Sequence, residues 1–314
     1  MAKLGFLFPG QGSQKVGMGK DLFTHSKDSR ALFERANALL GKPIDHICFE
    51  GPKDELTKTE NAQPGIFLVS LALLELLKQK GITPDYTAGH SLGELTAYYA
   101  AGAFGSDSAS LETALTVISA RGEAMAASHP PEDSAMAAVI GLSKEIIEQS
   151  LTAFQDYPVV IANCNTPEQT VISGTRTGVE QAGVILKEKG AKIIPLKVSG
   201  PFHSPLMKNG AELFSKKLNE LQSGQGSLLI KNAEIPIILN RTAVEEQNSD
   251  ALFKNLSLQI ISQVKWVDTI RYLKDKVDLF IECGPGKVLT GLVKKIDPDA
   301  AVVSVSCWED IESI

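Results

Sequence analysis

The sequence predicts an α/β protein with two domains: a large domain built on a parallel sheet, and a smaller domain inserted into it. Two observations support this prediction. Short, nearly continuous apolar runs alternate with longer helical stretches, which is the pattern of parallel strands buried on both faces. Between residues 132 and 198 the order of the elements changes. We therefore expect a large domain of residues 1–131 and 199–314, and a small domain of residues 132–198.

The strands expected in the large domain are apolar runs rich in branched or aromatic residues. They are Leu4–Phe8, Tyr86–Ala88, Ile235–Leu239, Leu279–Cys283 and Val302–Val305. The stretches between them have helical periodicity and are separated by Gly or Pro. The expected helices include Ser29–Leu40, Ile66–Lys80, Gly93–Ala101, Ser110–Met125 and Val264–Lys274.

The inserted segment predicts the order strand, helix, strand, strand, helix, strand. The expected elements are Ala135–Leu142, Ser143–Phe154 (capped by Ser143), Val159–Cys164, Thr170–Ser173, Thr175–Lys189 and Lys192–Val198. This order is typical of a ferredoxin-like α+β unit. Because an inserted domain creates a cleft between two lobes, we expect any ligand site to lie there.

Charge and composition exclude several classes of function. Lys and Arg number 31 against 37 Asp and Glu, a net charge of −6, and no long basic run exists to bind a nucleic acid. The longest apolar stretch, Ile66–Leu77, contains Ser70 and Glu75 and is shorter than the roughly 18 residues of a membrane span. The apolar run after Lys3 is too short for a signal peptide. The 4 cysteines form no CxxC pair, so we expect free thiols in a cytoplasmic protein.

The motif Gly89-His90-Ser91-Leu92-Gly93 matches GxSxG between an expected strand and an expected helix. This is the context of a nucleophile elbow, in which a tight turn exposes the serine hydroxyl at a helix N-terminus. The amide of Leu92 would then point toward a developing oxyanion. The alternative is that Ser91 and Glu94 form an S-x-x-E capping box on an ordinary helix.

A serine nucleophile needs a base, and the chain has 5 histidines. His203 lies in a Pro-flanked turn where the chain re-enters the large domain, which makes it the best candidate; the alternative is a histidine that only satisfies backbone groups. His129 could line the cleft. The other histidines, His25, His46 and His90, are expected to have surface or packing roles.

The glycine-rich turn Gly10-Gln11-Gly12-Ser13-Gln14 follows the first expected strand. A GxGxxG phosphate loop would need glycine where Lys15 stands, so this is not a dinucleotide fingerprint. The amide of Gln11 is instead a candidate second oxyanion donor; the alternative is an ordinary strand-to-helix turn. The cysteines and histidines show no spacing typical of metal ligands, so no metal is expected.

Together these motifs resemble the malonyl-coenzyme A:acyl-carrier-protein transacylases of fatty acid synthesis and the acyltransferase domains of polyketide synthases. The matching runs are Phe8–Gln14, Gly89–Glu94, Arg121-Gly122, Pro201–Ser204 and Gly284–Leu289, in the family's order and spacing over essentially the whole chain. The resemblance implies a hydrolase-like large domain with a ferredoxin-like small domain. The phenylalanine at position 202 is the residue type found in the malonyl-selective members that this sequence resembles.

The resemblance also implies a role for each site residue. Ser91 would be acylated, His203 would be the base, and the amides of Gln11 and Leu92 would form the oxyanion hole. A backbone carbonyl near Gln259 would orient His203 in place of an aspartate. Arg121 would pair with the malonyl carboxylate, and Gln63 would be a further pocket residue. A buried guanidinium does select acids, but without the resemblance Arg121 would be expected to be solvated on its helix.

The function expected is malonyl transfer from malonyl-coenzyme A to the phosphopantetheine thiol of acyl carrier protein, by a ping-pong mechanism through malonyl-Ser91, in fatty acid biosynthesis. We expect a monomer that needs no cofactor. The closest alternative is a standalone polyketide-synthase acyltransferase. A serine thioesterase or hydrolase would use the same pair with water as acceptor, and an idle docking module would not need Ser91, His203 and Arg121.

Overall fold

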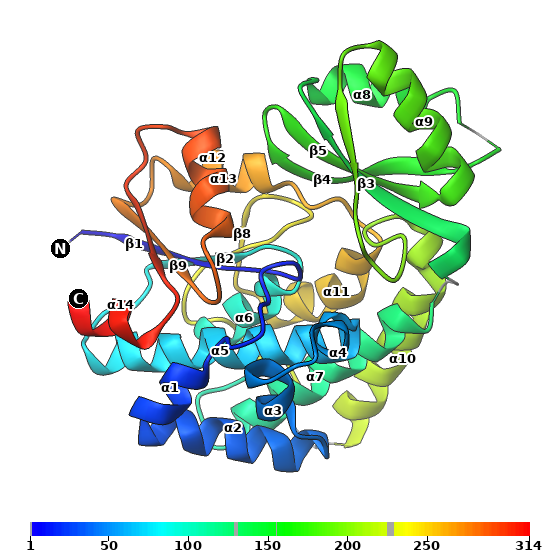
Figure 1. Cartoon of the computed structure of the whole chain (residues 1–314). Helices are drawn as coiled ribbons and strands as arrows, with labels where there is room; N and C mark the ends of the chain where they lie inside the picture. Colours follow the sequence, from blue (N-terminus) through cyan, green and yellow to red (C-terminus); the bar gives the residue numbers. More distant parts are fainter. Residues whose placement is uncertain (1, 129–130, 155, 225–228) are drawn as a thin grey trace.

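The protein is described from a computed structural model that places residues 2–128, 131–154, 156–224 and 229–314 (Figure 1). Its larger sheet has 6 strands in the order β10-β9-β1-β2-β7-β8. All neighbours are parallel except β7 and β8. The strands are β1 (Leu4–Phe8), β2 (Tyr86–Gly89), β7 (Ile237–Ile238), β8 (Glu245–Glu246), β9 (Leu279–Cys283) and β10 (Val302–Val305). The predicted α/β fold class is thus confirmed.

Helices cover both faces of this sheet (Figure 1). Phe6 and Phe8 pack into a large apolar cluster on one face, and Leu7 packs into a second cluster on the other, as alternation along a strand requires. The helices outside residues 132–198 are α1 (Lys20–His25), α2 (Lys27–Leu40), α3 (Ile44–Phe49), α4 (Lys53–Thr57), α5 (Thr59–Gln79), α6 (Gly93–Ala100), α7 (Ser110–Ala126), α10 (Lys208–Gly224), α11 (Ser249–Ile260), α12 (Trp266–Leu273), α13 (Val288–Ile296) and α14 (Trp308–Ser313). Short 3-10 turns lie at Pro131–Asp133 and Pro205–Met207.

Helix α5 begins at Thr59, earlier than the predicted Ile66, and contains Pro64. A proline inside a helix leaves the carbonyl four residues earlier without its backbone donor. Here that carbonyl belongs to Glu60, and Lys42 Nζ donates to it at 2.6 Å. The lysine thus replaces the missing donor, which explains why the helix continues through Asn61–Pro64 into the core.

Two further predictions for the large domain were wrong in their bounds. The strand expected over Ile235–Leu239 is confined to Ile237–Ile238, and the short strand β8 was not predicted. The helix expected from Val264 begins at Trp266, because Val264 pairs with the small domain: its N–H donates to the Ala162 carbonyl at 2.8 Å.

The second sheet has 4 antiparallel strands in the order β4-β5-β3-β6. With its two helices it follows the predicted ferredoxin-like order: β3 (Ser134–Ile140), α8 (Lys144–Leu151), β4 (Val159–Thr166), β5 (Gln169–Thr175), α9 (Arg176–Glu188) and β6 (Lys192–Pro195). It has its own apolar cluster, which includes Val139, Ile147 and Ile172.

Details of this second unit differ from expectation. Ser143 occupies the N-cap position of α8, but its side chain makes no capping hydrogen bond. Strand β6 ends at Pro195 rather than Val198. The Leu196 N–H still donates to the Met136 carbonyl, but Lys197 and Val198 leave the strand and line the cavity beside Ser91. In the described part of the chain, no helix is long and apolar enough to cross a membrane.

Candidate active site

Ser91 lies at the sharp turn between β2 and α6, with a φ of +52°. The two glycines of the motif are sterically required. A Cβ at Gly89 would collide with the backbone of Gly93, and a Cβ at Gly93 would collide with the carbonyl of Phe8. The turn can therefore close only with glycine at both positions, which is the geometry of a nucleophile elbow.

The capping-box alternative for Ser91 and Glu94 is wrong. The Ser91 hydroxyl faces His203, and the fully buried Glu94 carboxylate accepts from the Asn240 N–H and from Asn255 Nδ2. Glu94 thus braces the interior behind the turn instead of capping α6. Burial raises the pKa of Glu94 to about 7, against the opposing effects of these two hydrogen bonds.

His203 is in contact with the nucleophile: Ser91 Oγ lies 2.7 Å from His203 Nε2. On the other side of the ring, Nδ1 lies 3.1 Å from the Gln259 carbonyl and 3.0 Å from the Ser262 carbonyl. Because a carbonyl can only accept, Nδ1 carries the proton and Nε2 is free to accept the serine proton. Burial, followed by the charge of Arg121, lowers the pKa of His203 to about 3, so the imidazole is neutral at pH 7.

Of the other histidines that the structure describes, none contacts Ser91 Oγ. The side chain of His90 turns away, with Nε2 2.9 Å from Asn165 Oδ1 of the small sheet and its ring edge-on to Trp266. His25 stacks on Trp308, and His46 is exposed on α3. His129 lies outside the described residues.

Arg121 on α7 is completely buried and directed at the nucleophile, so the expectation of a solvated residue is wrong. Its Nη1 donates to Gln63 Oε1 at 2.9 Å, and its Nη2 donates to Gln259 Oε1 at 2.8 Å and to Ser91 Oγ at 3.3 Å. Burial lowers the pKa of Arg121 to about 10, which still leaves it cationic at pH 7.

No ion pair among the described residues involves Arg121, and its buried Nε has no hydrogen-bond partner. Its hydrogen bonds go to the neutral amide oxygens of Gln63 and Gln259 and to the Ser91 hydroxyl, and the acidic group that acts on its charge is Glu94. A buried guanidinium of this kind favours a ligand that brings a carboxylate.

The candidate oxyanion donors flank the nucleophile. Gln11 lies in the turn after β1 and lines the same cavity as Ser91 and His203. Leu92 is the N-cap of α6, so its N–H lies at the positive end of that helix. The Ser91 carbonyl accepts from Gln259 Nε2 at 2.8 Å, so the side chain of Gln259, as well as its carbonyl, belongs to the site.

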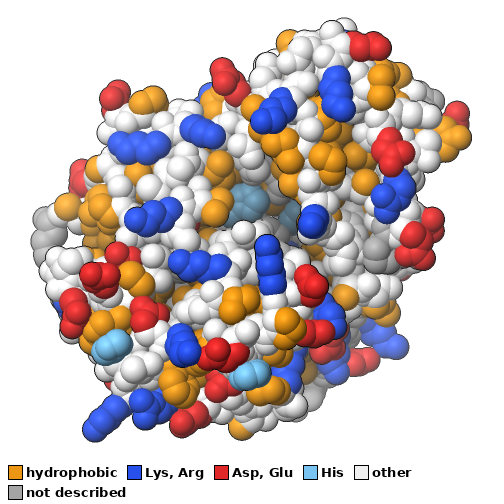
Figure 2. Space-filling model, in the orientation of Figure 1, with side chains coloured by type: hydrophobic (Ala, Val, Ile, Leu, Met, Phe, Trp, Pro, Cys, Tyr) orange, Lys and Arg blue, Asp and Glu red, His pale blue; other side chains and the backbone are white. Residues whose placement is uncertain are grey.

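Ser91 and His203 open into a cavity of about 330 Å³ between the two sheets. Figure 2 shows this hollow, with histidine side chains at its floor and basic side chains around its rim. Its lining comes from both units of the fold: Gln11, Gly12, Gln14, Thr57, His90, Met125, Met136, Asn163, Asn165, Val171, Leu196, Lys197, Val198 and Phe202, besides Ser91 and His203. The structure thus brings these residues together between the two sheets, where a ligand site was expected.

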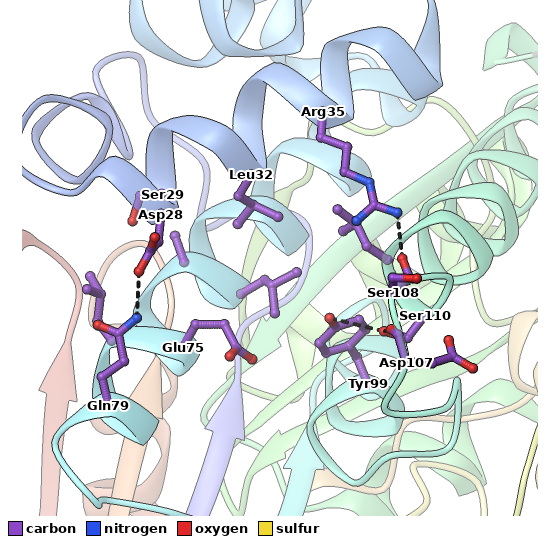
Figure 3. Close-up of a pocket in the computed structure, with 14 residues that line it drawn as sticks. Asp28, Ser29, Leu32, Arg35, Glu75, Gln79, Tyr99, Asp107, Ser108 and Ser110 are labelled. Atoms are coloured by element: carbon purple, nitrogen blue, oxygen red, sulfur yellow. Dashed lines mark hydrogen bonds between the residues drawn. The ribbon is translucent and has the colours of Figure 1, made fainter.

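A second cavity, of about 340 Å³, lies between α2, α5 and the start of α7 (Figure 3). Its polar groups are engaged at both ends: Gln79 donates to Asp28 at 2.9 Å, and Arg35 donates to the Ser108 carbonyl. It contains no serine–histidine pair, so it offers no nucleophilic chemistry. Within the described residues, no group of three or more His, Cys, Asp or Glu side chains could hold a metal ion.

Sequence reasoning missed Asn240 and Ser262. Asn240 Oδ1 accepts from the Ser91 N–H at 2.7 Å, and the Ser262 carbonyl shares the His203 proton with Gln259. The only signal for Asn240 was its place directly after the expected strand Ile235–Leu239, and a backbone carbonyl such as that of Ser262 leaves no mark on a sequence.

Comparison with known proteins agrees with this geometry. The family model for the acyl transferase domain matches residues 5–302. The chain belongs to this family. The malonyl CoA-acyl carrier protein transacylase of Bacillus subtilis strain 168 is 43% identical over 316 residues, which cover 99% of this chain and 96% of that protein.

Solved members of the acyl transferase family have the same fold. The acyl-carrier-protein-S-malonyltransferase of Bartonella henselae superposes with a TM-score of 0.92 at 36% identity, covering 99% of this chain and 98% of the other. A malonyl-transacylase in complex with its type II PKS acyl-carrier protein matches with a TM-score of 0.92 at 32% identity, covering 99% and 98%. The recognition of the family from its motifs is thus confirmed.

Proposed function

We propose that this acyl transferase moves the malonyl group of malonyl-coenzyme A to the phosphopantetheine thiol of an acyl carrier protein in fatty acid synthesis. The observation that carries the proposal is the placement of a buried, unpaired Arg121 guanidinium 3.3 Å from the hydroxyl of a serine that contacts a neutral histidine. Full-length relatives that are named for this reaction support it.

In the first half-reaction, His203 Nε2 takes the proton of Ser91 as Oγ attacks the thioester carbonyl. The amides of Gln11 and Leu92 stabilise the tetrahedral oxyanion, and Arg121 binds the malonyl carboxylate. The carbon–sulfur bond then breaks, and coenzyme A leaves as the thiol with the proton from His203.

In the second half-reaction, the same histidine takes the proton of the carrier thiol. The sulfur attacks the carbonyl of the malonyl-Ser91 ester and the ester carbon–oxygen bond breaks. The malonyl group leaves as the thioester of the carrier, and Ser91 Oγ takes back its proton from the imidazolium. Since Nδ1 donates to the Gln259 and Ser262 carbonyls, the imidazolium that forms in each half-reaction is stabilised without a carboxylate. The catalytic group is therefore a serine–histidine dyad.

A polyketide carrier is the alternative acceptor. A malonyl-transacylase of the same fold is solved with a type II PKS acyl-carrier protein, and its chain aligns over 99% of this one. Rates with purified fatty acid and polyketide carriers distinguish the two. A hydrolase with water as acceptor is disfavoured by the buried Arg121, which hydrolysis does not require.

We infer that the carrier, an acidic protein, meets a basic surface beside the cavity, because the chain itself has a net charge of −6. The candidates are exposed lysines: Lys187, Lys189, Lys192, Lys197, Lys208, Lys216 and Lys217, with Lys294 and Lys295 next. Lys197 lines the cavity, whereas Lys208 and Lys217 lie 3.8 Å from Glu212 and Glu220. Lys197 is therefore the best candidate, and Lys192 is the nearest of the others in sequence.

We also propose the domain division 1–131 and 199–314 against 132–198, supported by an apolar cluster whose buried members lie within residues 137–191, apart from Val267 of α12. The chain would act as a cytoplasmic monomer. Cys48, Cys164, Cys283 and Cys307 are free thiols, which supports a reducing compartment.

The test is mass spectrometry of the protein after incubation with malonyl-coenzyme A. The wild type is expected to carry one malonyl group on the peptide that contains Ser91, and to lose it to holo-carrier protein. Ser91→Ala keeps a small side chain in the turn and should carry none. Labelling of the Ala variant, or release of free malonate in place of malonyl-carrier, would contradict the proposal.

A further inference from the structure

Ser91 has a backbone conformation that residues other than glycine rarely adopt, and the structure shows what holds it. Its φ of +52° lies in the left-handed region. Such strain persists only where the surrounding structure determines the conformation. The peptide planes of the turn from Gly89 to Leu92 must therefore be held by groups around it.

One side-chain amide holds two successive peptide groups of this turn. Asn240 Nδ2 donates to the Gly89 carbonyl at 2.6 Å, and Asn240 Oδ1 accepts from the Ser91 N–H at 2.7 Å. The amide thus joins the residue before the turn to the nucleophile itself. It also occupies the Ser91 N–H, so that this group does not face the cavity as an oxyanion donor.

The next peptide group is held by a different amide. Gln259 Nε2 donates to the Ser91 carbonyl at 2.8 Å. In a trans peptide the C=O and the following N–H point in opposite directions. Fixing the Ser91 carbonyl therefore fixes the direction of the Leu92 N–H, and Asn240 and Gln259 together leave that N–H as the donor that the turn presents.

Asn240 is itself anchored. It follows β7, which pairs with β2, and it is completely buried. Its N–H donates to the Glu94 carboxylate, and its carbonyl accepts from the Lys265 N–H at 2.9 Å. Glu94 is held in turn by Asn255 Nδ2 at 2.7 Å. With its main chain fixed on both sides, the Asn240 amide keeps its position when the turn is under strain.

We propose that Asn240 is a positioning residue of the reaction: its amide holds the Gly89–Ser91 backbone in the strained conformation that places Ser91 Oγ against His203. It acts through Ser91 and touches no substrate. Glu94 and Asn255 support it from behind. The inference rests on Ser91 being the nucleophile of the proposed function.

The experiment compares Asn240→Ala and Asn240→Asp with the wild type in two measurements. The first is the rate at which a serine-directed fluorophosphonate labels Ser91, and the second is the pre-steady-state rate of malonyl-Ser91 formation. Without the Asn240 amide the turn can relax out of its strained, reactive conformation. The free energy of such strain corresponds to about a 10- to 100-fold change in rate, and we expect both rates to fall by that factor. KM for malonyl-coenzyme A and the preference for malonyl over acetyl should stay within about twofold, because Asn240 does not contact Arg121.

The Asp variant has the shape of asparagine but cannot donate to the Gly89 carbonyl, so it is expected to be slow as well. If it labels at the wild-type rate, the two-ended hold is refuted. Asn255→Ala is the control, since Asn255 contacts Glu94 and Tyr98 but no atom of the turn. It should lower the melting temperature but slow the labelling of Ser91 less than Asn240→Ala does.

Equal loss of rate in the Asn240 and Asn255 variants, measured per folded molecule by near-UV circular dichroism, would show a purely structural role and overturn the proposal. A wild type that reacts with the phosphonate but transfers no malonyl group would contradict the proposed function and leave this inference standing.

Discussion

Replacing Arg121 by alanine should remove the preference for malonyl over acetyl groups. The variant has two separate effects. It takes a donor from Gln63 Oε1 and Gln259 Oε1, at about 1–3 kcal/mol for each buried acceptor. This loss is felt equally by malonyl and acetyl substrates. Only a malonyl substrate also loses the contact between guanidinium and carboxylate, about 2–5 kcal/mol.

The second effect alone changes the selectivity. At about 1.4 kcal/mol per tenfold, the ratio of kcat/KM for malonyl-coenzyme A to that for acetyl-coenzyme A should fall by roughly 30-fold to several thousandfold. The assay uses stopped-flow to record the burst of acyl-Ser91 formation with each thioester.

Two variants make the Arg121 result specific. Arg121→Lys keeps a positive charge but loses the planar fork, so it should retain an intermediate selectivity. Arg241→Ala removes an arginine that also interacts with Glu94 but donates to Asn255 Oδ1 and not to Ser91, and it should leave the ratio unchanged. Equal losses for malonyl and acetyl substrates in Arg121→Ala would refute the reasoning, and Arg121 would then only support the fold.

Three further predictions concern the base, the carrier surface and the buried carboxyl. His203→Ala should slow acylation and deacylation together by about 10²–10⁴-fold, measured in separate single-turnover reactions, and near-normal rates in both would make His203 structural. Lys192→Glu combined with Lys197→Glu should raise KM for the carrier more than KM for malonyl-coenzyme A, and should flatten the salt dependence of the carrier reaction; Lys27→Glu on α2 is the control, and unchanged carrier kinetics would place the docking surface elsewhere. The pKa of Glu94 is raised to about 7 in the folded protein, so the folded state binds more protons than the unfolded state between about pH 4.5 and 7, and this group's contribution to stability falls as pH rises through that window. Glu94→Gln should remove this fall, seen as a more positive slope of unfolding free energy against pH in urea titrations, and an unchanged slope would contradict it.

The sequence predicted best those elements that are marked by the pattern of their own residues and do not depend on contacts with distant parts of the chain. Strands β1, β9 and β10 have the predicted bounds, because each is a short run of mostly apolar residues; Glu282 in β9 and Ser304 in β10 are the polar members. The start of α5 was missed because the compensation for Pro64 comes from Lys42, a side chain outside the helix. Val264 was placed in a helix because its pairing with Ala162 connects segments about a hundred residues apart, which no local pattern records.

The candidate site divides in the same way. Ser91 and Leu92 are marked by a local motif whose steric reason is local, since the turn itself excludes a Cβ at Gly89 and Gly93. The environment of Arg121 is not local, because its partners Gln63 and Gln259 come from two other helices. Only the resemblance to a family indicated a role for it, and periodicity alone favoured a solvated side chain.

The contact between Asn240 and Ser91 could have been predicted from the ends of the strands if the strand order had been known. Parallel strands place their carboxyl ends at one edge of a sheet, and ligand sites of open α/β sheets form there. Gln11 follows β1, Ser91 follows β2 and Asn240 follows β7, which are neighbours in the sheet. Because that order brings residue 240 beside residue 91, a polar residue shortly after the end of β7 is expected to meet the nucleophile. The missing information was the strand order: with β7 at any other position in the sheet, the amide that holds the turn would have to come from another strand.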